Sequence, residues 1–144
     1  MLISTKGQYA LIFMIDLAVY GNGNSVSIKS IAERQSLSEK YLEQVVSVLN
    51  NAGYVMSIRG AKGGYMIAGS PEKYTVGMVL RTVEGNLNPV DKQIDFKNEA
   101  GIMNEVTNSV WEKLSDAINY VVDKITLAEL ISEYNQKIQY NYVI

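Results

Sequence analysis

The segment SIRGAKGGYMIA, residues 57–68, combines two basic side chains with three glycines. The cationic groups of Arg59 and Lys62 can pair with phosphate oxygens. The glycines allow the backbone to approach a ligand closely and to present its N–H groups. This combination is typical of a loop that binds the phosphates of a polyanion. The alternative is a solvated turn that happens to carry two basic residues.

A β-hairpin is the element that we expect to position these two cations. Residues 54–59 and 65–68 predict its strands, because each is a short, partly apolar run beside a glycine-rich turn. The glycines of the turn, for which we expect positive φ angles, are Gly60, Gly63 and Gly64.

The chain contains no cysteine and no histidine. Disulfides, thiolate nucleophiles and nearly all transition-metal sites are therefore excluded, which leaves only carboxylate-rich sites for hard cations. The commonest general base is absent as well, and no constellation of carboxylate, lysine or tyrosine side chains replaces it. We predict that the protein is not an enzyme and needs no cofactor.

Length and composition predict one domain, or one domain with a dimerising appendage, since the chain has 144 residues of which 47% are apolar. Residues 1–70 carry six basic and four acidic side chains, a net charge of +2, whereas the remainder carries seven and eleven, a net charge of −4. This split suits a protein whose N-terminal half touches a polyanion. The apolar run of residues 9–20 is too short to span a bilayer and contains Asp16, so we expect a cytoplasmic protein.

A first helix is predicted ahead of the hairpin, with Ser4 or Thr5 as its cap and Gly21 as its left-handed C-terminal residue. Apolar residues cover most of its surface, so we expect it to lie buried between other elements.

Two further helices, joined by a short turn, follow the first. Ser27 caps a helix over residues 28–35, and residues 36–38 separate it from a helix over residues 39–51. The side chains expected inward on the last helix are Leu42, Val45, Val46 and Leu49. Those expected on its polar outer face are Lys40, Glu43, Gln44 and Ser47.

This order of elements predicts a winged helix-turn-helix domain over residues 1–70, in a fold that is mainly α with a small β-hairpin wing. Two helices around a turn are a weak signal for DNA binding by themselves, but the hairpin strengthens it. A wing beside a recognition helix lies along the sugar-phosphate backbone or enters the minor groove, where arginine is attracted by the negative potential.

The remainder is predicted to contain a connecting helix and linker over residues 71–98, followed by a dimerisation region over residues 99–144. Residues 74–85 form the connecting helix, and a long helix begins near Glu99. Its apolar stripe is Ile102, Val106, Val110, Leu114, Ala117 and Val121, widened by Met103 and Trp111. We expect this stripe to pair with a second chain; the alternative is packing against its own domain alone.

The last residues are predicted to form a short helix over 127–134, opened by a capping box from Thr126 to Glu129. In the last seven residues Ile138, Tyr140, Tyr142 and Ile144 alternate with Gln139, Asn141 and Val143, which predicts an extended tail.

Several segments together resemble the IscR/NsrR/CymR family of bacterial winged-helix transcription regulators. They are LISTKGQYAL, LSEKYLEQVVSVLNNAG, SIRGAKGGYMIA, YTVGMVLRTVEG, NPV and TLAELI, and they cover nearly the whole chain. The resemblance implies a homodimer on a palindromic operator in double-stranded DNA, with long helices crossing between the subunits.

The resemblance also implies which residues meet DNA. On the recognition helix and its cap they would be Ser38, Lys40, Tyr41, Glu43 and Gln44; at the wing, Arg59, Gly60 and Lys62; and at the first helix, Lys6 and Gln8 on phosphates. Gln44 can pair with an adenine edge, and Glu43 can accept from a cytosine amino group. The alternative for Glu43 is an ion pair with Lys40 or contact with solvent.

Family members that bind an iron–sulfur cluster carry three cysteines in the linker, and this chain has none. The resemblance is therefore to the cysteine-free branch, repressors of cysteine metabolism that act with cysteine synthase, O-acetylserine (thiol)-lyase. The tail Tyr142, Val143 and Ile144 would place a terminal carboxylate in that enzyme's active site; the alternative is an added strand or a frayed end. We thus expect a dimeric repressor, with a winged-helix interaction module that no longer binds DNA as the alternative.

Overall fold

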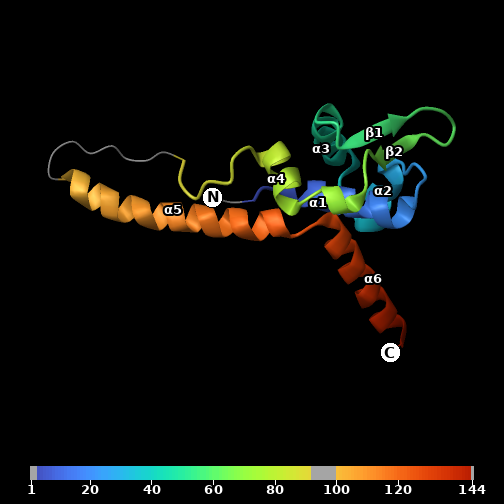
Figure 1. Cartoon of the computed structure of the whole chain (residues 1–144). Coiled ribbons are helices and arrows are strands. Elements are labelled where there is room, and N and C mark those ends of the chain that lie inside the picture. Colours follow the sequence, from blue (N-terminus) through green and yellow to red (C-terminus); the bar gives the residue numbers. More distant parts are fainter. Residues whose placement is uncertain (1–2, 92–99, 144) are drawn as a thin grey trace.

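The computed structural model describes residues 3–91 and 100–143. Its helices and strands, in chain order, are α1 (Thr5–Gly21), α2 (Ile28–Gln35), α3 (Glu39–Asn51), β1 (Val55–Ile58), β2 (Gly64–Ile67), the 3-10 helix η1 (Pro71–Lys73), α4 (Val76–Glu84), α5 (Ala100–Lys124) and α6 (Leu127–Val143). The hairpin and the first four helices gather at one end, α5 runs away from them, and α6 leaves at an angle to α5 (Figure 1). The predicted fold class, mainly α with a hairpin wing, is confirmed.

Helix α1 is the centre of the core, as its apolar sequence predicted. Phe13 and Met14 are fully buried, and α1 packs against α3, α4, α6 and β2. The left-handed residue at its end is Asn22, at φ 46°, and not Gly21, because the helix continues through Gly21 before the chain turns.

Helices α2 and α3 have the predicted bounds, residues 28–35 and 39–51. Their N-terminal caps are local: Ser27 Oγ accepts from the Ser30 N–H at 3.1 Å, and Ser38 Oγ accepts from the Tyr41 N–H at 3.3 Å. Capping by a neighbour in sequence explains why these boundaries could be predicted.

The hairpin is antiparallel, with Ser57 opposite Tyr65, and it gains a third partner on its other side. Val26 forms a bridge to Tyr65, with N–O distances of 2.8 and 2.9 Å. A Cβ atom on Gly64 would overlap the Val26 carbonyl oxygen, so glycine permits this close approach. Of the three turn glycines, only Gly60 has a positive φ, 118°. The positive φ expected at Gly63 and Gly64 was wrong. Gly64 is already the first residue of β2, and the Gly63 N–H closes the turn by donating to the Gly60 carbonyl at 3.0 Å.

Helix α5 is held to the body by α4. Arg81 forms two hydrogen bonds to Asp123, of 2.6 and 2.9 Å, and this hydrogen bonding holds the pKa of the Asp123 carboxyl below its usual range. Gly77 leaves the room for the pair, since a Cβ atom there would overlap Asp123 Oδ1.

The C-terminal prediction was wrong in part. Thr126 Oγ1 accepts from the Glu129 N–H at 3.2 Å, as expected for a cap, but α6 continues to Val143 instead of ending at residue 134. The expected extended tail is therefore helical up to Val143, and Ile144 lies outside the described residues.

No helix within the described ranges is both long and apolar enough to cross a membrane.

Candidate nucleic-acid interface

Helix α3 is divided sharply into a buried and an exposed face. The inward side chains Leu42, Val45, Val46 and Leu49 are completely buried. The outward side chains Lys40, Glu43, Gln44 and Ser47 are all exposed. This separation leaves a row of hydrogen-bonding groups on a rigid helix, which is what reading base edges in the major groove requires.

The first turn of α3 is held by α1. The rings of Tyr9 and Tyr41 meet edge to face, with centroids 5.1 Å apart, and the Ser38 N–H donates to Tyr9 Oη at 3.4 Å. Ser38 and Tyr41, both predicted to face DNA, thus also stabilise the start of the helix. Ser38 is exposed while Tyr41 is half-buried, so the Tyr41 ring is partly committed to packing.

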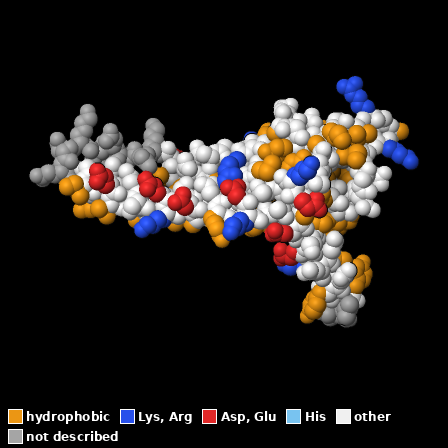
Figure 2. All heavy atoms as spheres, viewed as in Figure 1, with side chains coloured by type: hydrophobic (Ala, Val, Ile, Leu, Met, Phe, Trp, Pro, Cys, Tyr) orange, Lys and Arg blue, Asp and Glu red, His pale blue; other side chains and the backbone are white. Residues whose placement is uncertain are grey.

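The wing places its cations in solvent. Arg59, Gly60 and Lys62 are exposed, and in the part of the chain that the structure describes neither Arg59 nor Lys62 forms an ion pair. Basic side chains project at the hairpin end of the molecule, whereas the visible face of α5 carries a row of acidic ones (Figure 2). The sign of the charge on each region agrees with the split seen in the sequence.

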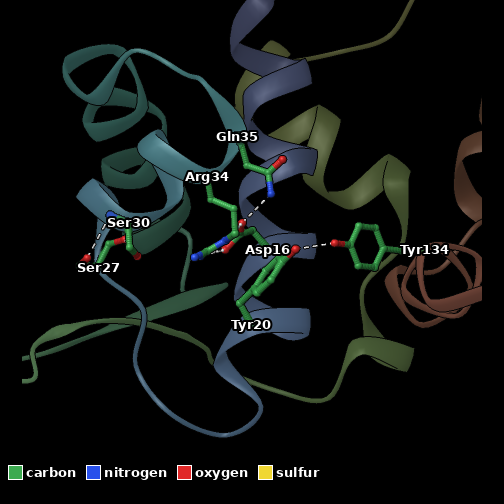
Figure 3. A network of polar contacts seen from close by, with 7 residues as sticks. All are labelled: Asp16, Tyr20, Ser27, Ser30, Arg34, Gln35 and Tyr134. Atoms are coloured by element: carbon green, nitrogen blue, oxygen red, sulfur yellow. Dashed lines mark hydrogen bonds and ion pairs between the residues drawn. The ribbon is translucent and has the colours of Figure 1, made fainter. Parts of the chain in front are cut away.

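A buried ion pair fixes α2, and sequence reasoning missed it. The Asp16 side chain has 0% exposure, and Arg34 donates to both of its oxygens, at 2.7 and 2.9 Å (Figure 3). Gln35 donates to the same carboxylate at 2.8 Å. The hydrogen bonding of Arg34 to Asp16 raises the pKa of Arg34 above its ordinary value. The available signal was an acidic residue inside an otherwise apolar helix, which in the sequence argued only against a membrane span.

The same cluster reaches the C-terminal helix. The Arg34 guanidinium lies 4.0 Å from the centroid of the Tyr20 ring, and the hydroxyl of Tyr20 is hydrogen-bonded to that of Tyr134 on α6. This hydroxyl contact raises the pKa of Tyr134. Side-chain contacts therefore link α1 to both α2 and α6 (Figure 3).

The N-terminus of α1 is capped from a distant part of the chain. Glu84 Oε1, at the end of α4, accepts from the Ser4 N–H at 2.9 Å, the Ser4 hydroxyl at 2.6 Å and the Gly7 N–H at 3.1 Å. The cap predicted from the Ser4 or Thr5 side chain was wrong, because Ser4 is the boundary residue but Glu84 supplies the acceptor. Lys6 and Gln8 remain exposed beside this capped end, so phosphates there would have to be bound by their side chains.

The other predicted binding residues lie away from α3 and the wing. The α5 stripe is exposed in this chain, with Ile102, Val106 and Val110 at 70%, 59% and 48%. Leu114, Ala117 and Val121 are exposed as well, while Ile118 and Val122 pack on α4. At the end of α6, Tyr142 is 86% exposed.

The elements and their arrangement define a winged helix-turn-helix transcription regulator, in which α3 is the recognition helix and β1–β2 the wing. The chain belongs to the Rrf2 family, described as iron-dependent transcriptional regulators, whose family model matches residues 3–133.

Two relatives are named as HTH-type transcriptional regulators. The chain is 43% identical to the HTH-type transcriptional regulator CymR of Bacillus subtilis (strain 168), over 92% of this chain and 91% of that protein. It is 36% identical to the HTH-type transcriptional regulator IscR of Aliivibrio salmonicida (strain LFI1238), over 91% of this chain and 77% of that protein. The solved structure of CymR (YrzC), the global cysteine regulator of B. subtilis, superimposes with a TM-score of 0.80 at 42% identity, covering 92% of this chain and 98% of that one. The chain is thus a transcriptional regulator and not an enzyme, as predicted.

The iron in the family description does not fit the donor set of this chain. Iron–sulfur clusters are held mainly by cysteine thiolates, with histidine as the usual substitute, and the sequence contains neither residue. Across the described ranges, no three acidic side chains come together in a way that would hold a metal ion.

Proposed function

We propose that the protein is a dimeric, sequence-specific repressor that places α3 in the major groove of a palindromic operator and the wing in the adjacent minor groove. The observation that carries this proposal is the exposed polar face of α3, on a helix whose other face is completely buried, near a wing with exposed cations. The family membership and the description of the B. subtilis relative as a global cysteine regulator support control of cysteine or sulfur metabolism genes.

Within this proposal the exposed side chains have separate tasks. Gln44 reads an adenine edge and Glu43 accepts from a cytosine amino group, while Lys40 and Ser38 contact bases or phosphates nearby. Arg59 and Lys62 bind the backbone or minor groove, and Lys6 and Gln8 bind phosphates beside α1.

The dimer is supported by the exposed stripe of α5. Ile102, Val106 and Val110 are large apolar side chains that their own domain does not cover. Contiguous exposed apolar surface of this kind marks an interaction site, and a second copy of the same helix is the occupant proposed here.

A cytoplasmic complex with cysteine synthase is the remaining part of the proposal, and it rests on the resemblance. The helical form of α6 removes the extended tail as an argument for it. The supporting feature is the exposed Tyr142 in the last turn of α6, a helix that leaves at an angle to α5 (Figure 1).

The experiment that tests the function is selection of the purified protein against a random duplex pool at about 0.15 M salt, near physiological screening. We expect enrichment of a palindromic sequence, whose genomic matches identify the regulated genes. If nothing is enriched, the selection is repeated with cysteine synthase present. Enrichment only then would indicate a repressor that needs the enzyme, and none in either case would favour an interaction module that does not bind DNA.

The wing and the recognition helix make different predictions. Replacing Arg59 or Lys62 by alanine removes a cation from a phosphate, so affinity falls for every sequence and the salt slope decreases by roughly one unit for each phosphate that is no longer neutralised. Replacing Gln44 by alanine removes a hydrogen-bonding partner of a base, so preference disappears at one position, at a cost of about 1–3 kcal/mol. Fluorescence anisotropy titrations at several salt concentrations measure both effects. An unchanged slope in the wing variants would contradict the wing assignment.

A further inference from the structure

Among the residues that the structure describes, one side-chain hydrogen bond joins the tip of the wing to another element. Residues 59–62 are exposed, and beyond the strand pairing the tip is closed by a backbone hydrogen bond from Gly63 to Gly60 of 3.0 Å. In the described structure, the side-chain hydrogen bond that joins the tip to another element comes from Ser25, whose hydroxyl donates to the carbonyl oxygen of Lys62. Arg59 and Lys62 therefore lie on a turn that is hydrogen-bonded to the Ser25 hydroxyl, on the loop between α1 and α2.

Ser25 itself lies on a well-supported loop. The next residue, Val26, is bridged to β2 by two backbone hydrogen bonds to Tyr65, and Asn24 donates to the Gly21 carbonyl at 2.9 Å. The side chain of Ser25 is half-buried. The loop thus provides a fixed point from which one hydrogen bond can set the direction of the tip.

The Ser25 hydroxyl has no part in holding α2. The N-cap of α2 is Ser27, and Ser30 is bonded within its own turn, to the Ser27 carbonyl at 2.8 Å. Loss of the Ser25 hydroxyl should consequently leave the helix-turn-helix intact, which separates its role from general stability.

We propose that Ser25 is a positioning residue for DNA recognition, whose hydroxyl holds the wing tip in the orientation in which Arg59 and Lys62 reach the DNA backbone. The proposal rests on the DNA-binding function above. Without the hydroxyl the tip keeps only its own turn and must be ordered when DNA binds, which costs conformational entropy and lowers affinity.

The test compares two variants of nearly the same shape, Ser25→Thr and Ser25→Val, of which only the first keeps a hydroxyl. Binding to the selected duplex is measured by fluorescence anisotropy at one salt concentration. We expect S25T to bind like the natural chain and S25V to bind about three- to tenfold more weakly, the range of one net hydrogen bond. Urea midpoints of the two variants should agree, since neither changes the core.

A second arm shows whether Ser25 acts through the wing. In a chain that already carries Arg59→Ala and Lys62→Ala, S25V should lower affinity no further, because the groups that it positions are gone. Equal affinity of S25V and S25T in the unmodified wing would overturn the proposal. A loss of equal size in both backgrounds would overturn it too, since the hydroxyl would then touch DNA directly.

The third measurement needs no DNA. In the free protein, the {1H}–15N heteronuclear NOE of residues 60–63 should fall in S25V and not in S25T, because an unheld tip moves faster. Unchanged values would remove the positioning role whether or not the protein binds DNA. If the natural chain binds no duplex, with or without cysteine synthase, the proposed function fails while this measurement still decides the role of Ser25.

Discussion

At the scale of single residues, the two partners of the Asp16–Arg34 pair differ in their exposure to solvent. The Asp16 carboxylate is fully buried, while the Arg34 side chain keeps 28% of its surface in solvent. Removing either partner therefore has unequal effects. Without Arg34 a charge is left in the core with only Gln35 as a partner, whereas without Asp16 the guanidinium can still be hydrated.

We predict that Arg34→Ala lowers the free energy of unfolding by about 3–5 kcal/mol, the cost of leaving a buried charge unpaired. Asp16→Ala should cost less than Arg34→Ala. Urea unfolding at pH 7 measures both. The matched control is Lys137→Ala, which breaks the exposed ion pair with Glu133, of 74% and 59% exposure, and should cost about 0.5 kcal/mol or less. An Arg34 variant as stable as this control would show that the pair does not fix α2.

At the scale of elements, the sequence was sufficient to predict a helix whose cap and apolar spacing lie within the helix itself. Helices α2 and α3 begin at serine caps within the same turn, and their apolar spacing identified the buried face correctly. The sequence was insufficient where the group that caps a helix lies far away along the chain. Glu84 caps α1 from 77 to 80 residues away, a contact that no local pattern contains.

The same reasoning explains the error at α6. The alternation of Ile138, Tyr140 and Tyr142 with polar residues fits a strand of period two, yet these residues continue a helix. Four-residue spacing from Tyr134 through Ile138 to Tyr142 fits a helix equally well, and helix and strand cannot be told apart in so short a run. Of the candidate site, the α3 face and the wing tip were predictable because both are local, whereas their supports, Tyr9, Ser25 and Asp16, depend on tertiary contacts.

Helix α4 provides a test at this scale, because Glu84 joins it to α1. Glu84→Ala removes the acceptor for three donors at the N-terminus of α1, and we expect a decrease of about 1–2 kcal/mol in the free energy of unfolding, typical of removing a cap. DNA affinity should fall as well, since this end of α1 carries Lys6 and Gln8, and Tyr9 supports α3. Denaturation and anisotropy measure the two effects. Glu72→Ala on η1, an exposed position, is the control and should change neither quantity.

At the scale of the whole molecule, α5 extends well beyond the helices that pack against it. Its 25 residues span roughly 37 Å at the rise of an α-helix, and its N-terminal half runs away from the other helices (Figure 1). That half carries the most exposed part of the stripe, Ile102, Met103 and Val106. A second chain related by a two-fold axis would cover the stripe and set two recognition helices at a fixed spacing, as a palindromic operator requires.

The last prediction follows from this geometry. Val110 lies within the stripe and is exposed in the single chain, whereas Asn108 lies on the opposite side of α5. Val110→Asp would bury a charge against apolar side chains of the partner, so the protein should become monomeric and bind its operator far more weakly. Asn108→Asp adds the same charge on the opposite side of the helix and should leave the dimer intact. Light scattering after size-exclusion chromatography measures the mass of each variant. A protein concentration of about 10 μM keeps a dimer with a micromolar Kd largely associated. A natural chain of monomeric mass, or a V110D variant that still dimerises, would show that another surface holds the two subunits together.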